Sequence, residues 1–250
     1  MTVHIENENP LIGDALGSYP FILHFAAREK TYVTGTINSL VKDVVYAPDV
    51  IYATPQEPIR IKYTLHPQNS LNYSVAHPEA NHMAQGYFGQ FQLAVPSLPI
   101  RLPLRDQAVV EKFDIIISPF SFSDRSNVKK WPKDKWCEFI DHYKSKYTIG
   151  VLGGPIDDFT PYIAAGAVPF QSRPLAEVYF LLKQAKVVVT VDTSINHMCH
   201  FGGISHHVLL FPRTLPRGFA ESPLAHMVQQ VSIHYTTVSE VIEATNKFLI

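Results

Sequence analysis

Polar residues interrupt an apolar stretch at 187–203, VVVTVDTSINHMCHFGG. Asp192, Thr193 and Ser194 directly follow a run suited to a buried strand, and a second apolar segment carrying His197 begins behind them. Hydroxyl groups and the unpaired amides of a helix start bind phosphate, and the helix dipole favours the negative charge. Asp192 is unsuited to contact a phosphate, so we expect it to hold the loop by accepting backbone hydrogen bonds. The pattern predicts an anion site at the carboxyl end of a strand.

The histidines of this stretch allow a second interpretation, a metal site. His197 and His200 are three residues apart, and Cys199, His206 and His207 lie nearby in the sequence. Imidazole and thiolate groups are ligands of zinc. We favour packing over metal binding, because paired glycines and a strand pattern separate the two groups of candidate ligands. The sequence has no paired-cysteine or His-Glu-x-x-His motif.

A hydroxyl-rich segment at 118–132, SPFSFSDRSNVKKWP, also has the composition of a phosphate site. Ser121 and Ser123 can donate hydrogen bonds, and Lys129 supplies a mobile positive charge, a combination that suits a diphosphate. A solvated surface loop is the alternative interpretation.

A third group, GGPIDD at 153–158, follows another strand pattern. Gly153 and Gly154 would form the turn, and Asp157 or Asp158 could accept hydrogen bonds from ribose hydroxyls. Glycine pairs at strand ends are also common as plain turns, so the motif by itself is a weak signal.

The fourth group is IGD at 12–14, where a loop pattern passes into a helix pattern. Gly13 allows the backbone to approach a ligand closely. Asp14 could act as a general base or a nucleophile. On spacing alone, a simple helix cap is the favoured interpretation of Asp14.

The elements that position these groups are clearest in the second half of the chain. Apolar runs alternate there with helix patterns that begin at prolines, and TVSE at 237–240 is a capping box. The alternation predicts a parallel, doubly wound sheet over about 113–250. The expected strands are 114–120, 148–154, 187–192, 207–212 and, more weakly, 231–235.

The first half has less regular patterns, which predict a smaller α/β domain. Helices are expected at 13–29, with Pro20 inside, and at 82–95. Short strands are expected at 31–35, 44–47, 50–53 and 59–63. The proline-rich segment 93–107 is typical of a linker between domains.

The composition restricts the class of protein. The chain has 250 residues, 46% apolar and 17% charged, with a net charge of −1. These values indicate a globular protein and give no overall electrostatic case for nucleic acid or anionic membrane. Cys137 and Cys199 suit a reducing cytosol, no signal peptide is visible, and no apolar run approaches the ~20 residues of a membrane span. We therefore expect a cytoplasmic protein without a transmembrane segment.

Together the motifs resemble glycosyltransferase family 9, the heptosyltransferase-like group. The similarity is strongest over 114–212 and thin over 11–46. The motif residues are Gly13-Asp14 with Pro20, Lys129 with Trp131-Pro132, Gly153-Gly154-Pro155, and Asp192-Thr193 with His197.

The resemblance implies a GT-B-like α/β fold, with two Rossmann-like domains, parallel sheets and a reduced N-terminal domain. Residues 1–105 would form the acceptor-side domain, ending in the proline-rich linker, and 106–250 the nucleotide-sugar-binding domain. The implied activity is an inverting transfer of a sugar from a nucleotide-diphosphate sugar to an acceptor hydroxyl of a saccharide or glycolipid. No cofactor is implied, and the enzyme is expected to be metal-independent.

The same resemblance gives roles to individual residues. Asp14 would remove the proton of the acceptor hydroxyl. Lys129, with Ser121 or Ser123, would neutralise the leaving diphosphate. The other donor-binding residues would be Gly153, Gly154, Asp157, Asp192, Thr193, Ser194 and His197, with Asp158 as the alternative ribose contact. Ser194 is a departure, because the family usually has glycine there.

Three alternatives remain open from the sequence. The acceptor could be a modified nucleic-acid base or a protein, although the near-neutral charge does not favour nucleic acid. The chain could also be a noncatalytic nucleotide-sugar-binding protein. A sugar-nucleotide epimerase on the same fold is the third.

Overall fold

The chain forms two compact units, each built on its own parallel sheet. The computed structural model describes residues 2–9, 11–35, 41–56, 59, 61–77, 82–121, 128–213 and 224–249. The first unit contains residues up to Arg105 together with His200–Gly202, and the second contains residues 106–199, 203–213 and 224–249. None of the helices formed by these described residues is long and apolar enough to span a membrane.

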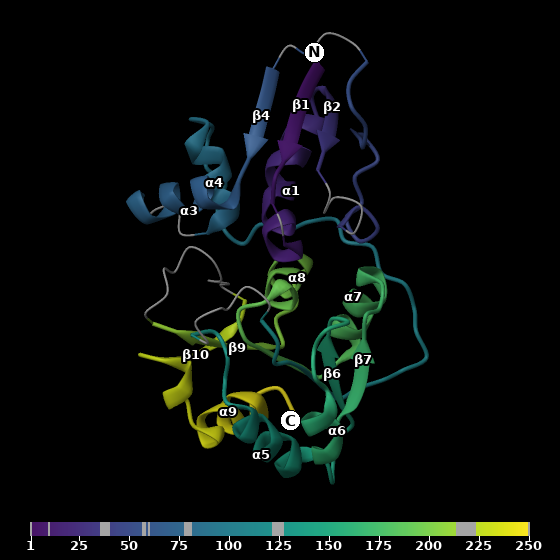
Figure 1. Cartoon of the computed structure of the whole chain (residues 1–250), viewed down its shortest axis with the longest axis vertical. Coiled ribbons are helices and arrows are strands. Elements are labelled where there is room, and N and C mark those ends of the chain that lie inside the picture. The colour runs from purple at the N-terminus through teal and green to yellow at the C-terminus, as the bar shows by residue number, and fades with distance from the viewer. Residues whose placement is uncertain are drawn as a thin grey trace. The chain divides into compact units, whose positions relative to one another are not determined.

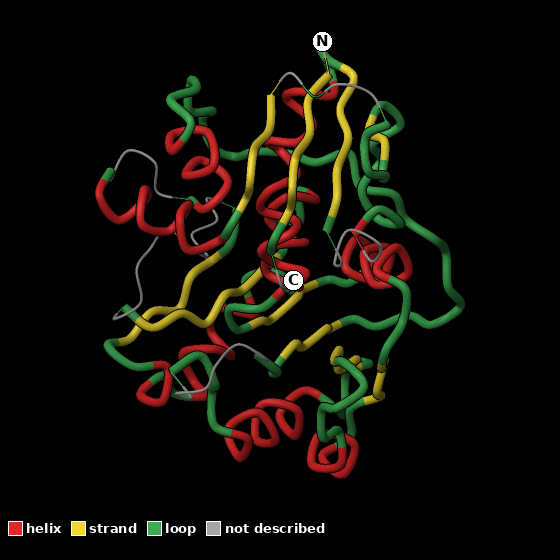
Figure 2. The backbone as a smooth tube through the Cα atoms, turned by 45° about the horizontal axis from the view of Figure 1, so that its top comes forward, coloured by secondary structure: helices red, strands yellow, loops and turns green. Residues whose placement is uncertain are grey.

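The first unit has a four-stranded sheet in which every pairing is parallel. Its strands are β1 (Thr2–Asn7), β2 (Lys30–Thr34), β3 (Val50–Ile51) and β4 (Ile61–Leu65). They lie in the order β3-β2-β1-β4, and Figure 2 shows the three longer strands running side by side. The strand order reverses between β1 and β4, and such a reversal at the carboxyl ends of parallel strands is where ligands bind in open α/β sheets.

Three described helices belong to this unit: α1 (Ile12–Ala26), α3 (Pro67–Ala76) and α4 (Met83–Gln90). α1 follows β1 directly and buries most of its residues, with Pro20 inside the helix. The Phe21 ring lies 5.2 Å from that of Tyr63 on β4 and 5.5 Å from that of Phe88 on α4. The aromatic contacts therefore tie both helices to the sheet.

The second unit has a six-stranded parallel sheet. Its order is β10-β9-β8-β5-β6-β7, which is the 3-2-1-4-5-6 order of dinucleotide-binding folds. The order reverses between β5 and β8, which we call the switch point. The strands are β5 (Ile115–Ser118), β6 (Ile149–Gly153), β7 (Val168–Gln171), β8 (Val187–Thr190), β9 (His207–Pro212) and β10 (His226–Gln230).

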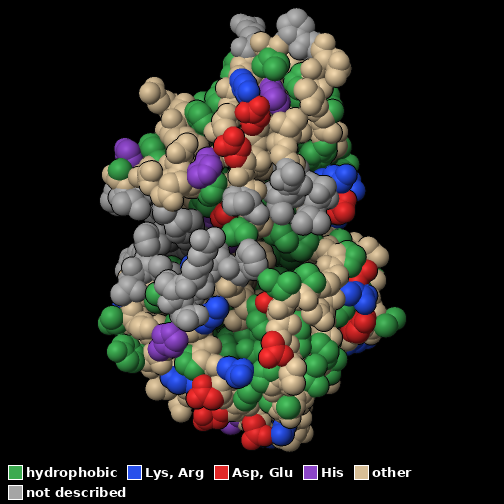
Figure 3. All heavy atoms as spheres, viewed as in Figure 1, with side chains coloured by type: hydrophobic (Ala, Val, Ile, Leu, Met, Phe, Trp, Pro, Cys, Tyr) green, Lys and Arg blue, Asp and Glu red, His purple; other side chains and the backbone are tan. Residues whose placement is uncertain are grey.

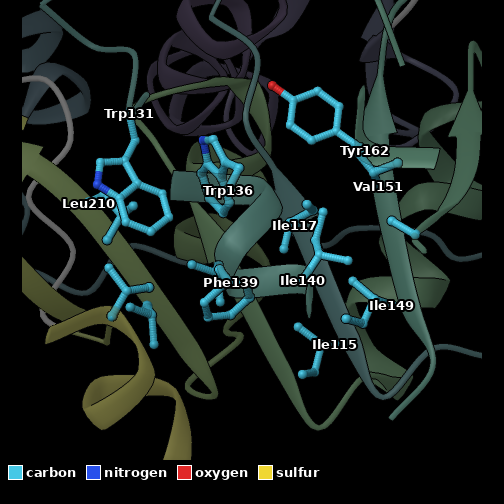
Figure 4. Packing of buried hydrophobic residues seen from close by; sticks show 14 of the residues in the cluster. Ile115, Ile117, Trp131, Trp136, Phe139, Ile140, Ile149, Val151, Tyr162 and Leu210 are labelled. Atoms are coloured by element: carbon cyan, nitrogen blue, oxygen red, sulfur yellow. The ribbon is translucent and has the colours of Figure 1, made fainter. Parts of the chain in front are cut away.

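Helices cover both faces of this sheet (Figure 1). α5 (Lys133–Tyr143), α6 (Thr160–Ala165) and α9 (Val238–Asn246) lie on one face, and α7 (Leu175–Gln184) and α8 (Ser194–Gly202) on the other. Figure 4 shows Trp136, Phe139 and Ile140 of α5 packed onto the isoleucines of β5 and β6. The Trp131 ring stands at 84° to that of Trp136, with 4.9 Å between their centres. This core fixes the chain just before α5, where Lys129 lies.

The surface carries no concentration of one charge on the face that Figure 3 shows. Acidic and basic side chains of the second unit are interspersed there among apolar and polar ones. This distribution agrees with the net charge of −1.

The α/β class with two parallel sheets is confirmed, and several elements differ from the sequence-based expectation. Residues 44–47 form no strand, and only Val45 makes an isolated bridge, to Leu104. The expected strand at 231–235 is a 3-10 helix (η2, Ile233–Tyr235), because Ser232 caps it by accepting from the His234 amide. The strand lies earlier, at β10. The expected helix at 82–95 ends at Gln90.

Candidate functional site

The two loops at the switch point are joined by side-chain contacts. Ser118 of β5 pairs with Thr190 of β8, so both strands end at the same level. Beyond them, the Ser121 hydroxyl donates to the Asp192 carbonyl oxygen at 3.2 Å. The contact joins two motifs that lie 71 residues apart in the sequence.

Lys129 and Asp192 form an ion pair at this point. The Lys129 Nζ lies 2.5 Å from Asp192 Oδ2, and the side chains are 20% and 3% exposed. The sequence-based expectation that Asp192 holds the loop through backbone hydrogen bonds is therefore incomplete, because the principal described partner of its carboxylate is an ammonium. The pair fixes Lys129 while leaving part of its side chain accessible to a ligand.

His197 lies beside the same carboxylate. Its Nε2 is 3.8 Å from Asp192 Oδ1, too far for a hydrogen bond. Burial is the largest influence and lowers the pKa of His197, the Asp192 charge opposes this, and the Lys129 charge adds to it. His197 is therefore neutral near pH 7, and the site carries one positive and one negative charge.

The start of α8 has the geometry of an anion-binding helix end. The Thr193 hydroxyl accepts from the Ile195 amide at 3.1 Å, and the Thr193 carbonyl accepts from the His197 amide at 3.3 Å. Thr193 is thus the cap of the helix, and Ser194 is its first residue. The amide of a first helical residue has no partner within its own helix and can bind an external anion.

A cavity of about 550 Å³ opens next to Ser121. Phe120 and Tyr162 line it with aromatic surface, while Lys130, Lys133 and His234 bring nitrogen-containing side chains. Asp157 and Asp158 line the same cavity. Its size is within the usual range of small-molecule sites. Sequence reasoning missed Lys133, Tyr162 and His234, although the proline-led start of α5 was a signal for Lys133.

Packing explains why glycine occurs in the loop formed by Gly153, Gly154 and Pro155. A Cβ atom on Gly153 would lie 2.7 Å from ring atoms of Phe120 and Phe159, so only glycine allows these rings to pack there. The Gly154 amide donates to Asp157 Oδ2 at 2.7 Å and closes the turn. Asp157 and Asp158 both line the cavity, and Asp158 also bonds to the first residue of α6, Thr160.

Asp158 accepts from the Thr160 amide at 3.0 Å, and the Thr160 side chain and amide both lower the pKa of its carboxyl. Among the donor-site candidates, Ser123 lies outside the described residues. The remaining donor-site candidates all belong to the second unit.

Asp14 belongs to the first unit, where it is half-buried in the first turn of α1. The cap position is Leu11, which makes no side-chain capping bond. Asp14 is therefore the third residue of the helix and not its cap, contrary to the interpretation that spacing alone favoured. Its negative charge near the amino end of α1 interacts favourably with the helix dipole.

Comparison with known proteins gives matches to solved structures. No family model and no curated protein match the sequence. The glycosyl transferase family 9 protein of Veillonella parvula superposes with a TM-score of 0.71 at 15% identity, covering 99% of this chain and 97% of that one. Escherichia coli ADP-heptose LPS heptosyltransferase II gives 0.68 at 13% identity, covering 100% and 98%.

The glycosyltransferase TibC of enterotoxigenic E. coli is a further structural neighbour. It superposes with a TM-score of 0.68 at 19% identity, and the match covers 89% of this chain and 61% of TibC. This chain therefore spans less than two thirds of the TibC length. A second TibC structure is a complex with ADP-D-β-D-heptose.

Both TibC structures are described as iron-containing. Proteins with this fold can therefore contain a metal, and the metal independence that we expected from the sequence is wrong. The described residues of this chain nevertheless do not fit an iron site, since no group of three or more His, Cys, Asp or Glu side chains is placed to hold a metal ion.

The candidate ligands on and after α8 have partners of their own. Burial raises the pKa of the Cys199 thiol. The His200 ring stacks on His82 at 4.5 Å, and His207 Nε2 lies 2.8 Å from Thr190 Oγ1. These side chains do not converge on one point.

At the level of the fold, the earlier resemblance is confirmed: this chain has the heptosyltransferase-like fold of glycosyltransferase family 9.

Proposed function

We propose that this chain is a glycosyltransferase that transfers a sugar, with inversion, from a nucleotide-diphosphate sugar to an acceptor hydroxyl. The observation that carries the proposal is the Lys129–Asp192 ion pair at the switch point, connected through Ser121, which donates to Asp192 and lines a cavity of about 550 Å³. A partly exposed ammonium and the Ser194 amide at the start of α8 suit a diphosphate. The adjacent cavity has room for the nucleoside.

The donor would lie across the carboxyl ends of β5, β6 and β8. The Ser194 amide and Lys129 would hold the diphosphate, with Ser121 fixing the Asp192 loop. The nucleoside would occupy the cavity, where Phe120 offers a ring for base contact and Asp157 an acceptor for ribose hydroxyls. Because Asp192 already neutralises the charge of Lys129, the amide at the start of α8 must contribute much of the stabilisation of the diphosphate.

In the transfer step, the acceptor oxygen forms a bond to the anomeric carbon as the bond from that carbon to the diphosphate oxygen breaks. The acceptor proton passes to the Asp14 carboxylate, and the electron pair of the broken bond leaves with the nucleoside diphosphate. Lys129 and the α8 amides stabilise the charge that develops on this leaving group. A single displacement inverts the anomeric centre.

The acceptor that we propose is a saccharide or glycolipid hydroxyl, and the proposed location is the cytoplasm. ADP-sugars are the first donors to test, because TibC was solved with ADP-D-β-D-heptose. In this proposal Asp14 is the general base, and the first unit binds the acceptor.

The test is a calorimetric titration with ADP, UDP and GDP sugars, followed by measurement of nucleoside diphosphate release with and without candidate acceptors. Saturable binding with acceptor-dependent release supports the proposal. Binding without release in any combination would favour the noncatalytic nucleotide-sugar-binding alternative. No binding of any nucleotide would overturn the proposed donor site.

A further inference from the structure

A chain of neutral hydrogen bonds lies at the carboxyl end of β1 in the first unit. The Tyr87 hydroxyl donates to Asn9 Oδ1 at 2.6 Å, and Asn9 Nδ2 donates to Asn7 Oδ1. Asn7 Nδ2 then donates to the Ser18 hydroxyl at 3.0 Å, and Ser18 donates to the Ala15 carbonyl at 2.7 Å. We call this the Tyr87 relay, and all four side chains are buried.

All hydrogen bonds of the relay run in one direction, from the Tyr87 hydroxyl as the first donor to the Ala15 carbonyl as the last acceptor. Burial raises the pKa of Tyr87, and the Asp14 charge adds to this, so the phenol keeps its proton and remains the donor. Asn9 must then present its carbonyl to Tyr87 and its amide nitrogen to Asn7. The same reasoning orients Asn7 toward Ser18. A network in which each donor finds one acceptor specifies a single arrangement of its side chains.

The relay connects the elements around Asp14. Tyr87 lies on α4, Asn7 ends β1, Asn9 lies in the loop before α1, and Ser18 lies on α1. Its last acceptor, the Ala15 carbonyl, belongs to the residue directly after Asp14. The loop before Asp14 and the helix turn after it are therefore held by one set of hydrogen bonds.

We propose that Tyr87 is a positioning residue for Asp14, acting through Asn9, Asn7 and Ser18 to fix the loop and first turn that carry the carboxylate. This inference rests on the proposed function, in which Asp14 is the base. A general base must be held close to its productive geometry, because a small displacement of reacting groups lowers the rate strongly. The relay contains no charged group, so it fixes the backbone without adding a charge beside the carboxylate.

The test is Tyr87→Phe, which keeps the ring and removes the donor. We expect kcat to fall about tenfold through misplacement of the base, with the donor KM unchanged because the donor residues belong to the second unit. Tyr63→Phe is the matched control. Tyr63 lies in the same unit and packs against Phe21 and Phe91, and its hydroxyl has no part in the relay. Its kcat should equal that of the wild type.

A second comparison separates positioning from plain structural support. In the Asp14→Asn background, Tyr87→Phe should lower kcat no further, because the group that it positions no longer acts as a base. A tenfold loss that persists in this background would overturn the proposal. Wild-type kcat in a folded Tyr87→Phe protein would do the same.

Ser18→Ala tests the other end of the relay and serves if Tyr87→Phe does not fold. We expect a loss of about threefold in kcat, again with an unchanged donor KM, because the bonds from Asn7 and to Ala15 are lost while Tyr87, Asn9 and Asn7 stay linked. An unchanged kcat in folded Ser18→Ala would count against the relay. Absence of transfer by the wild-type protein would instead overturn the proposed function, and the inference with it.

Discussion

The two units share a strand order but differ in the chemistry at the strand ends. In each, four strands follow the order 3-2-1-4, and the strand order reverses between the first and fourth of them. In the first unit this place holds the neutral Tyr87 relay and Asp14. In the second it holds the start of α8 and an ion pair between the partly exposed Lys129 and the buried Asp192. The same topology therefore supports two different chemistries through the side chains that follow the strands.

The difference has a physical meaning for ligands. A neutral, fully hydrogen-bonded network can orient a reactive carboxylate, but it offers no charge to an anion. A partly exposed ammonium next to helix amides attracts an anion and stabilises a leaving group. The comparison predicts that changes in the first unit affect turnover, and that changes in the second affect binding and stability.

The largest expected effect is on Asp14. Asp14→Asn keeps the size of the side chain but cannot accept the acceptor's proton, so we expect turnover to fall ~100-fold or more, with donor affinity unchanged. The measurement is the transfer rate at saturating donor. Asp43→Asn is the control, because Asp43 is an exposed carboxylate of the same unit.

Stability helps to interpret this result. Asp14 is not the cap of α1, and its replacement by asparagine should lower the unfolding free energy by about 0.3–1 kcal/mol through the loss of a favourable dipole interaction. A near-wild-type rate in the folded variant would remove the assignment of Asp14 as the base. The fold would be unaffected by that outcome.

Lys129→Ala should have the next largest effect, because it changes both binding and stability. Removing one partner of a buried ion pair leaves Asp192 buried without its countercharge, which costs about 3–5 kcal/mol. Donor affinity should also fall about 10- to 100-fold, the usual effect of losing a hydrogen bond to a charged group. Calorimetry and thermal unfolding measure the two effects.

A double variant separates them. Lys129→Ala with Asp192→Asn removes both charges and should recover much of the stability without recovering donor affinity. Lys144→Ala is the control, since Lys144 pairs with Asp141 on the exposed side of α5. If the double variant regains wild-type affinity for the donor, then Lys129 does not bind it.

The sequence predicted the second unit better than the first for a physical reason. β5, β6, β8 and β9 are buried on both faces, and such strands read as continuous apolar runs. β10 was missed because its residues are half-buried at the sheet edge and their pattern is mixed. The strand expected at 50–53 is present as β3, which has only two residues.

The candidate site was predicted in part. The motifs placed Ser121 and Lys129 in one segment, 118–132, and Asp192 in another, and the strand order brings these two segments together. The ion pair between Lys129 and Asp192 could not be predicted, because it joins loops that follow two different strands. The Tyr87 relay joins α4 to the end of β1, and no local pattern indicates such a contact.

A smaller effect is expected at the start of α8. Ser194→Pro removes one backbone amide, yet proline is tolerated at the first position of a helix, so stability should change little. If this amide binds the diphosphate, donor affinity should fall about tenfold, the usual effect of one hydrogen bond to a charged group. Ser194→Gly keeps the amide and should bind like the wild type. Equal affinity of the proline variant would exclude this amide from the site.

The smallest expected effect concerns pH and again separates the two units. Burial lowers the pKa of His197 in the folded protein, so below its ordinary pKa of about 6.5 the unfolded chain binds a proton that the folded chain does not. His197 therefore contributes stability above that pH, and the contribution is lost as the pH falls. The slope is at most about 1.4 kcal/mol per pH unit for one proton.

His197→Gln should flatten this dependence between pH 7 and 5, measured as the free energy of unfolding in urea. His142→Gln, at an exposed position on α5, should leave the slope as in the wild type. The Tyr87 relay has no group that titrates in this range, so Tyr87→Phe should lower stability equally at both pH values. An unchanged slope in His197→Gln would mean that His197 is not responsible for the pH dependence. In that case the acid sensitivity would have to come from groups other than His197, and the contrast between the two units would rest on Lys129 and Asp192 alone.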